Sequence, residues 1–167
     1  MTDLKTILLA EDNAKDVELT LEALAEHNLA NEVVVVTDGA EALDYLHCRG
    51  KFGGRAKTNP AVVLLDLKMP KVDGLQVLAQ IKADARLRSV PVVMLTSSRE
   101  EQDLVESYKL GVNAYVVKPI DFGDFITAVK QLGVFWAVIN EPPPGSARVE
   151  RDEVGQRGRA MEGSAQR

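Results

Sequence analysis

The chain has 167 residues, of which 46% are hydrophobic and 27% are charged, and its formal net charge is −5. This length and composition are typical of one soluble globular domain. Residues 141–167 hold five arginines and five acidic residues, so the rest of the chain carries the whole negative charge. An acidic body is a poor electrostatic match for nucleic acid, and we expect no nucleic-acid partner.

The cysteine content is consistent with a reducing compartment, and the apolar patterning predicts no membrane segment. Cys48 is the only cysteine, which excludes an internal disulfide and a cysteine-based zinc cluster. Residues 1–13 are too short and too acidic for a signal peptide, and no segment approaches the roughly 20 apolar residues of a membrane helix. We expect a cytoplasmic protein. His27 and His47 are expected at the surface or at helix ends, because neither has a neighbour that indicates catalysis.

Five short apolar runs alternate along the chain with segments of helical spacing. The alternation predicts a doubly wound α/β fold, a parallel sheet with helices on both faces, because parallel strands need crossover connections. Helical spacing is visible in residues such as Val17, Leu21 and Leu24. The predicted strands are residues 6–10, 32–36, 61–65, 90–95 and 114–117.

Two segments depart from this alternation. Residues 48–59 contain Arg49, Lys51, Arg55 and Lys57 without an acidic residue, and we favour a solvated loop over a surface for docking a kinase or another partner. Residues 141–167 begin near three consecutive prolines and contain few large apolar side chains. We expect one domain over residues 1–140 and a disordered tail over 141–167; the alternative is a short helix over 149–154 packed on a partner.

Charged and hydroxyl side chains stand at the ends of four predicted strands, and they point to phosphoryl chemistry. Three carboxylates at one sheet edge require a cation, for which Mg²⁺ with its oxygen ligands is the natural candidate. An aspartate nucleophile needs no deprotonation at neutral pH, and a metal, a lysine and a hydroxyl would neutralise the transferred phosphoryl group. The residues are Glu11, Asp12, Asp66, Thr96 and Lys118.

The motifs EDN, LLDLKMPKVDG, LTSS and YVVKP, in this order, resemble the receiver domain of two-component response regulators over about residues 4–140. The resemblance implies a flavodoxin-like fold with strand order 2-1-3-4-5. It also implies that Asp66 accepts a phosphoryl group from a histidine kinase. Mg²⁺ would be bound by Asp12 and Asp66 directly, by Glu11 through water, and by the backbone carbonyl of Lys68. Glu11 departs from the commoner aspartate by one methylene.

The same resemblance assigns roles to residues after the later strands. Thr96 would be the switch hydroxyl and Tyr115 the aromatic side chain whose rotamer reports its movement. Lys118 would pair with the phosphoryl group, and its bond to Pro119 would be cis. Pro70 and Gly74 would shape the loop after the acceptor.

The last predicted helix carries more apolar surface than one sheet can cover. Phe122, Phe125, Ile126, Val129, Leu132 and Trp136 follow core spacing, whereas Val134, Phe135 and Val138 lie on other faces. Receivers commonly dimerise through their fourth and fifth helices and the fifth strand. The resemblance therefore implies a homodimer, with a dimer face of Val134, Phe135, Trp136 and Val138.

Finer features, including DNAKDVELTLEAL and SYKLGVNAYVVKPID, resemble stand-alone receivers that serve phytochrome-type histidine kinases. We therefore expect a single-domain response regulator, not an enzyme, that signals by protein contact or phosphorelay. One alternative is an aspartyl-nucleophile phosphohydrolase, although Lys68 stands where such enzymes carry a second acid. The other is an interaction module that has lost phosphorylation.

Overall fold

The computed structural model describes residues 6–25, 32–107, 109–110 and 114–134. Each strand lies within one or two residues of its predicted run. The strands are β1 (Ile7–Ala10), β2 (Val33–Val36), β3 (Val62–Asp66), β4 (Val92–Thr96) and β5 (Tyr115–Val117). The helices are α1 (Ala14–Ala25), α2 (Gly39–Leu46), α3 (Gly74–Ala83), α4 (Arg99–Ser107) and α5 (Phe122–Gln131), with a short 3₁₀ helix, η2 (Gly50–Phe52).

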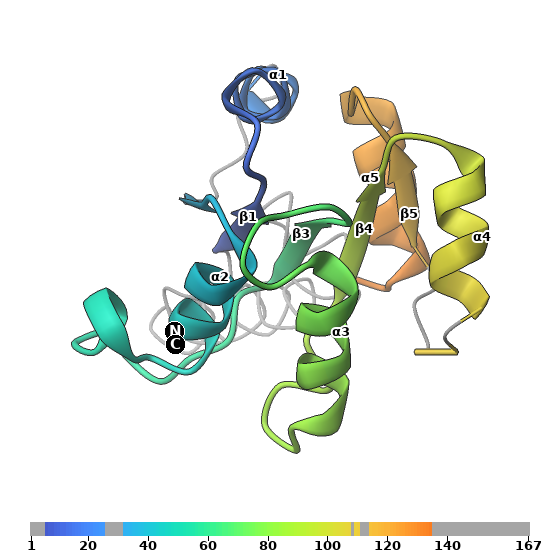
Figure 1. The fold of residues 1–167 in the computed structure, drawn as a ribbon. Helices are drawn as coiled ribbons and strands as arrows, with labels where there is room; N and C mark the ends of the chain where they lie inside the picture. The colour runs from blue at the N-terminus through green and yellow to red at the C-terminus, as the bar shows by residue number, and fades with distance from the viewer. Residues whose placement is uncertain (1–5, 26–31, 108, 111–113, 135–167) are drawn as a thin grey trace, which may run out of the picture.

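The five strands form one parallel sheet in the order β2-β1-β3-β4-β5, which confirms the predicted doubly wound fold and its strand order. The order reverses between β1 and β3, which are neighbours although β2 lies between them in the chain. Figure 1 shows the helices distributed around the sheet. In such sheets, ligands bind beyond the carboxyl ends of the strands at the reversal point, so the ends of β1 and β3 are the first place to look.

The core has two halves, one on each face of the sheet. Alternate residues of each strand point to opposite faces, and parallel strands are apolar on both. Leu24 of α1 and Phe125 of α5 pack on one face, with Ile7 and Leu9 of β1. Leu78 of α3 packs on the other face, together with residues of α2 and α4 and with Leu8 of β1. The unbroken apolar runs in the sequence follow from this two-sided burial.

Three helices begin at an aspartate that accepts a hydrogen bond from the first turn. Asp38 caps α2 and Asp121 caps α5, each accepting from a backbone N–H three residues later at 2.7 Å. Asp73 caps α3 and forms a reciprocal capping box with Gln76. Such caps satisfy N–H groups that have no partner within the helix. They fix where each helix leaves the carboxyl edge of the sheet.

The basic segment 48–59 is packed more closely against α2 than a solvated loop would be. Arg49 pairs with Asp44 at 2.8 Å, and Arg55 lies over the Tyr45 ring at 3.9 Å from its centroid. Arg55 also donates hydrogen bonds to the Tyr45 carbonyl near the end of α2. The prediction of a solvated loop therefore holds only for the outer surface of this segment.

Several predictions fall on residues outside the described ranges. They include His27, the tail over 141–167, and three members of the expected dimer face, Phe135, Trp136 and Val138. The fourth member, Val134, is half-buried and packs against the core beside α5, and its place in a dimer face stays a prediction. His47 lies at the end of α2, as expected. Within the described part of the chain, none of the helices has both the length and the apolar character to cross a membrane.

Candidate functional site

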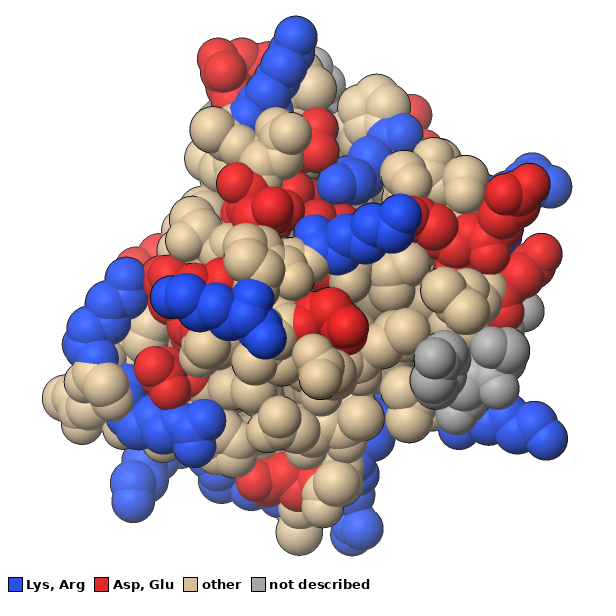
Figure 2. Space-filling model, in the orientation of Figure 1, with Lys and Arg blue, Asp and Glu red and all other residues tan. Residues whose placement is uncertain are grey.

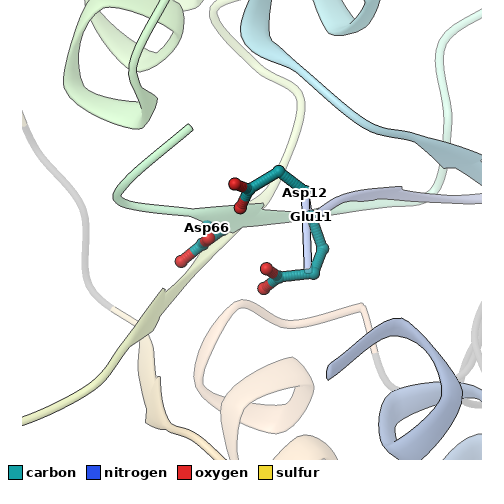
Figure 3. A group of neighbouring side chains, drawn as sticks. All are labelled: Glu11, Asp12 and Asp66. Atoms are coloured by element: carbon teal, nitrogen blue, oxygen red, sulfur yellow. The ribbon is translucent and has the colours of Figure 1, made fainter. Parts of the chain in front are cut away.

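Three carboxylates meet where β1 and β3 end. Ala10 pairs with Leu65 in the register of these strands, so Glu11, directly after β1, lies beside Asp66, the last residue of β3. Glu11 is fully buried, Asp66 is 4% exposed and Asp12 is exposed. Figure 3 shows the three carboxyl groups around a common space, and one oxygen of each lies within 4.8 Å of the others. The sequence prediction that these side chains converge is confirmed.

Lys118, from the end of β5, places its ammonium group among carboxylates. Its Nζ lies 3.1 Å from Glu11 Oε2, 3.2 Å from Asp66 Oδ1 and 3.1 Å from Asp16 Oδ2. The side chain is only 18% exposed, so these contacts are less screened than surface ion pairs. Figure 2 shows acidic side chains gathered below α1 with basic side chains among and beside them.

Burial makes the two inner carboxylates weaker acids. It raises the pKa of Glu11 to about 7, against the opposing hydrogen bond from the Asn13 N–H, and the nearby Asp66 charge raises it further. Burial also raises the pKa of Asp66, although Lys118 opposes this shift. For Lys118, burial lowers the pKa, but the carboxylates of Asp16, Asp66 and Glu11 outweigh it and raise the pKa above its usual value. The site holds more negative charge than one lysine neutralises.

The donor set fits a hard divalent cation. Carboxylate oxygens are the ligands that Mg²⁺ and Mn²⁺ take in proteins, and an added positive charge would relieve the raised pKa values of Glu11 and Asp66. Glu11, Asp12 and Asp66 would hold such an ion. The backbone carbonyl of Lys68 follows Asp66 by two residues, and its role as a ligand stays a prediction.

Thr96 ends β4 beside this cluster. Its hydroxyl is fully buried, and it makes no hydrogen bond among the residues that the structure describes. The Thr96 carbonyl accepts a hydrogen bond from the Lys118 N–H at 2.7 Å, which ties the ends of β4 and β5 together. A buried hydroxyl without an acceptor is unusual, and it is consistent with an acceptor that arrives with a ligand.

The remaining predicted residues surround the site. Tyr115 begins β5 and lines a groove of about 470 Å³ between α4 and α5. The Lys118–Pro119 bond is cis, as the resemblance implied. A Cβ at Gly74 would lie 2.2 Å from the Asp66 carbonyl oxygen, so glycine is required where the loop that contains Pro70 closes onto β3.

The sequence of residues 7–130 matches the protein-family model of the response regulator receiver domain. The chain belongs to this receiver family. It is similar to the solved structure of the bacteriophytochrome response regulator AtBRR, with 64% identity and a TM-score of 0.78 over 82% of this chain and 98% of that one.

Two further relatives show the range of proteins that this receiver resembles. The Mn²⁺-bound form of the response regulator Rcp1, a protein of Synechocystis, is 38% identical, with a TM-score of 0.63 over 80% of this chain and 94% of that one. The probable methanogenesis regulatory protein FilR2 of Methanothrix harundinacea is 42% identical over 82% of this chain and 86% of its own length.

The receiver's sequence did not reveal two contacts of the site. Asp16, in the first turn of α1, shares the Lys118 ammonium with Glu11 and Asp66. Glu101, in the first turn of α4, pairs with Lys68 at 3.1 Å. The sequence did carry one sign of these contacts, because each acid lies about one helical turn beyond a residue at a strand end. Acids in the first turn of a helix are common, however, and most of them only stabilise the helix dipole.

Glu101 also interacts with the backbone beside Thr96. Its Oε2 accepts a hydrogen bond from the Ser97 N–H. Burial raises the pKa of Glu101, but the Ser97 hydrogen bonds and Lys68 outweigh burial and lower the pKa below its usual value. The contacts with Ser97 and Lys68 therefore hold the Glu101 carboxylate in place at the edge of the site.

Proposed function

We propose that this receiver accepts a phosphoryl group from a histidine kinase on Asp66, with Mg²⁺ as cofactor. The observation that carries the proposal is the position of Asp66, a buried carboxylate 3.2 Å from the Lys118 ammonium and within 4.8 Å of two further carboxylates that could hold a cation. Burial favours a reactive nucleophile because water does not solvate it strongly. The unpartnered hydroxyl of Thr96 adds a donor for a phosphoryl oxygen.

In the proposed step, an Asp66 carboxylate oxygen attacks the phosphorus of the kinase phosphohistidine. An O–P bond forms, the P–N bond breaks, and its electron pair stays on the histidine ring, which takes up a proton from solvent. Lys118 would form an ion pair with a phosphoryl oxygen, and the Thr96 hydroxyl would donate to another. A bound Mg²⁺ would neutralise part of the phosphoryl charge, held by Glu11, Asp12 and Asp66.

Two other functions remain as alternatives. A phosphohydrolase of this type would need a general acid for its leaving group, but Lys68, two residues after Asp66, is paired with Glu101. An interaction module without phosphorylation would leave the buried charges of Glu11 and Asp66 without a use. We therefore propose a phospho-acceptor that is not an enzyme, with slow loss of its own phosphoryl group as its only hydrolysis.

Incubation with Mg²⁺ and acetyl phosphate, followed by intact-mass analysis, separates these functions. The wild type should gain one phosphoryl group per chain, and Asp66→Asn should gain none. Asp103→Asn, an exposed carboxylate change on α4, is the matched control and should behave as wild type. Continuous release of phosphate from external esters would favour the hydrolase, and an unmodified wild type would favour the interaction module.

The partner that we propose is a histidine kinase of the phytochrome type in the cytoplasm. The support is the 64% identity to AtBRR, which is named a bacteriophytochrome response regulator. The test compares phosphotransfer rates from a phytochrome-type kinase and from a histidine kinase of another class. A faster transfer from the second kinase would contradict this assignment.

We also propose that the receiver forms a homodimer. It would transmit its signal by protein contact or phosphorelay, and Thr96 and Tyr115 would couple the site to the face formed by α4, β5 and α5. Leu104 of α4 and Val117 of β5 are exposed apolar residues of these elements, 47% and 38% exposed. Sedimentation of Leu104→Asp against wild type, with and without phosphorylation, tests it. A monomeric wild type under both conditions would contradict the dimer.

A further inference from the structure

Glu101 joins two groups that border the Asp66 site but come from different strands. One oxygen accepts the Ser97 N–H, directly after β4, and the other lies 3.1 Å from Lys68 Nζ, shortly after β3. The Glu101 side chain is only 13% exposed, whereas that of Lys68 is 80% exposed. The carboxylate is therefore the fixed partner, and the long lysine side chain reaches over to it.

The two donors lie just beyond the last paired residues of β3 and β4. Asp66 pairs with Leu95, and the Leu67 N–H donates to the Leu95 carbonyl, so the strands separate where Lys68 and Ser97 begin. Ser97 directly follows Thr96, whose buried hydroxyl has no hydrogen-bond partner among the described residues. On this side of Asp66, the buried Thr96 hydroxyl thus has no acceptor among the described residues, whereas the Ser97 N–H and the Lys68 ammonium already contact the Glu101 carboxylate.

We propose that Glu101 is a positioning residue that occupies, in the unphosphorylated receiver, the Ser97 N–H and the Lys68 ammonium that a phosphoryl group on Asp66 would otherwise use. The inference rests on the proposed function of Asp66. A carboxylate and a phosphoryl group are both anionic acceptors and compete for the same donors. Glu101 therefore lowers the affinity of the site for the phosphoryl group, and phosphorylation releases it from both contacts.

A purely structural role for Glu101 makes a different prediction. The spacing from Ser98 to Glu101 matches a capping box, and Ser98 Oγ accepts the Glu101 N–H at 3.3 Å. In that motif, however, the acidic side chain accepts from the N-cap residue itself, whereas Glu101 accepts from Ser97, one residue earlier. Glutamine serves in a capping box as well as glutamate does. Glu101→Gln therefore keeps the Ser98 cap, which uses the backbone N–H of residue 101, and removes the charge that competes with the phosphoryl group.

The experiment titrates the full chain with beryllium fluoride, an analogue of the phosphoryl group, at saturating Mg²⁺, and follows binding by calorimetry. Glu101→Gln should lower the half-saturating concentration about three- to tenfold, the effect of one hydrogen bond of ordinary net strength, because a neutral amide competes less strongly than a carboxylate for the Ser97 N–H and does not pair with Lys68. The matched control is Glu100→Gln, the same charge change on an exposed neighbour, which should shift it less than twofold. The Ser97 amide proton resonance should move on beryllium fluoride binding in the wild type.

The outcomes distinguish this inference from the proposed function. If the wild type binds beryllium fluoride but Glu101→Gln binds it no more tightly, Glu101 is only a helix cap and the inference is wrong. Equal gains in Glu100→Gln and Glu101→Gln would show a general charge effect and would also overturn it. A wild type that neither binds beryllium fluoride nor is modified at Asp66 would instead contradict the proposed function.

Discussion

Lys118 at the end of β5 and Asp16 in the first turn of α1 form an ion pair of 3.1 Å across 102 residues of sequence. The pair fastens α1 to the carboxyl edge of the sheet on the side opposite α4. Among the described residues, Lys118 is the only cation that pairs with Glu11 and Asp66, and these two carboxylates share it with Asp16. Lys118 therefore has a structural partner that is neither the expected acceptor nor an expected metal ligand.

Replacing Asp16 by asparagine should destabilise the protein by about 1 kcal/mol. The ion pair with Lys118 is lost, but the amide oxygen of asparagine can still accept a weaker hydrogen bond from the ammonium group. Urea denaturation without Mg²⁺ measures the change. Glu18→Gln is the matched control, because it changes an exposed carboxylate of the same helix and should alter the free energy of unfolding by less than about 0.5 kcal/mol. Equal effects of the two changes would show that the Lys118 contact contributes nothing.

The strand-end residues were predictable from the sequence because parallel strands impose a strong pattern. Buried strands read as unbroken apolar runs, and the polar residue after each run must lie at the same edge of the sheet. This reasoning brought Glu11, Asp66 and Lys118 together correctly. It could not find Asp16 or Glu101, because a first-turn carboxylate reaches the site only if the helix leaves the strand at a particular angle. That angle is set by caps and packing, not by periodicity.

The raised pKa of Glu11, about 7, predicts that the metal-free protein loses stability as the pH rises. Between the usual carboxyl pKa of 4.5 and about 7, the folded protein binds a proton at Glu11 that the unfolded chain has released. Folding is therefore favoured at low pH in this window, and the benefit, on the order of 2 kcal/mol, is lost by pH 8. Urea denaturation at pH 5 and pH 8 measures the difference.

Glu11→Gln isolates the contribution of Glu11 from that of other titrating groups. The variant should lose this part of the pH dependence and be more stable than wild type at pH 8. Mg²⁺ should stabilise the wild type more at pH 8 than at pH 5, because the metal competes with the proton. An identical pH dependence in the two proteins would show that Glu11 titrates as an ordinary exposed carboxyl.

Gly74→Ala should disrupt the loop that closes onto Asp66. The added Cβ would lie 2.2 Å from the Asp66 carbonyl oxygen and 2.8 Å from Leu67 Cα, so the backbone must move. We expect a loss of about 2 to 3 kcal/mol in the free energy of unfolding, with slower phosphorylation of Asp66. Gly54→Ala is the control, because its Cβ would meet no atom within 4 Å. Equal stabilities of the two variants would contradict the close approach.

Thr96→Val tests whether the buried hydroxyl serves the free receiver or its ligand. Valine has nearly the shape of threonine and removes a buried group that has no hydrogen-bond partner among the described residues, so the free protein should keep or gain up to about 1 kcal/mol of stability. Beryllium fluoride with Mg²⁺ should then raise the melting temperature of the variant less than that of the wild type. Differential scanning calorimetry of both proteins, with and without beryllium fluoride, gives the four melting temperatures to compare.

Thr20→Val is the matched control for this change. Thr20 is also buried, but its hydroxyl donates to the Asp16 carbonyl at 2.7 Å, so valine should leave that bond unmade and destabilise the free protein by about 0.5 to 1.5 kcal/mol. The shift caused by beryllium fluoride should stay as in wild type, because Thr20 lies within α1 and its hydroxyl is already bonded to the Asp16 carbonyl. If Thr96→Val destabilises the free protein as Thr20→Val does, the Thr96 hydroxyl has a resting partner. The idea that it awaits a phosphoryl oxygen would then fail.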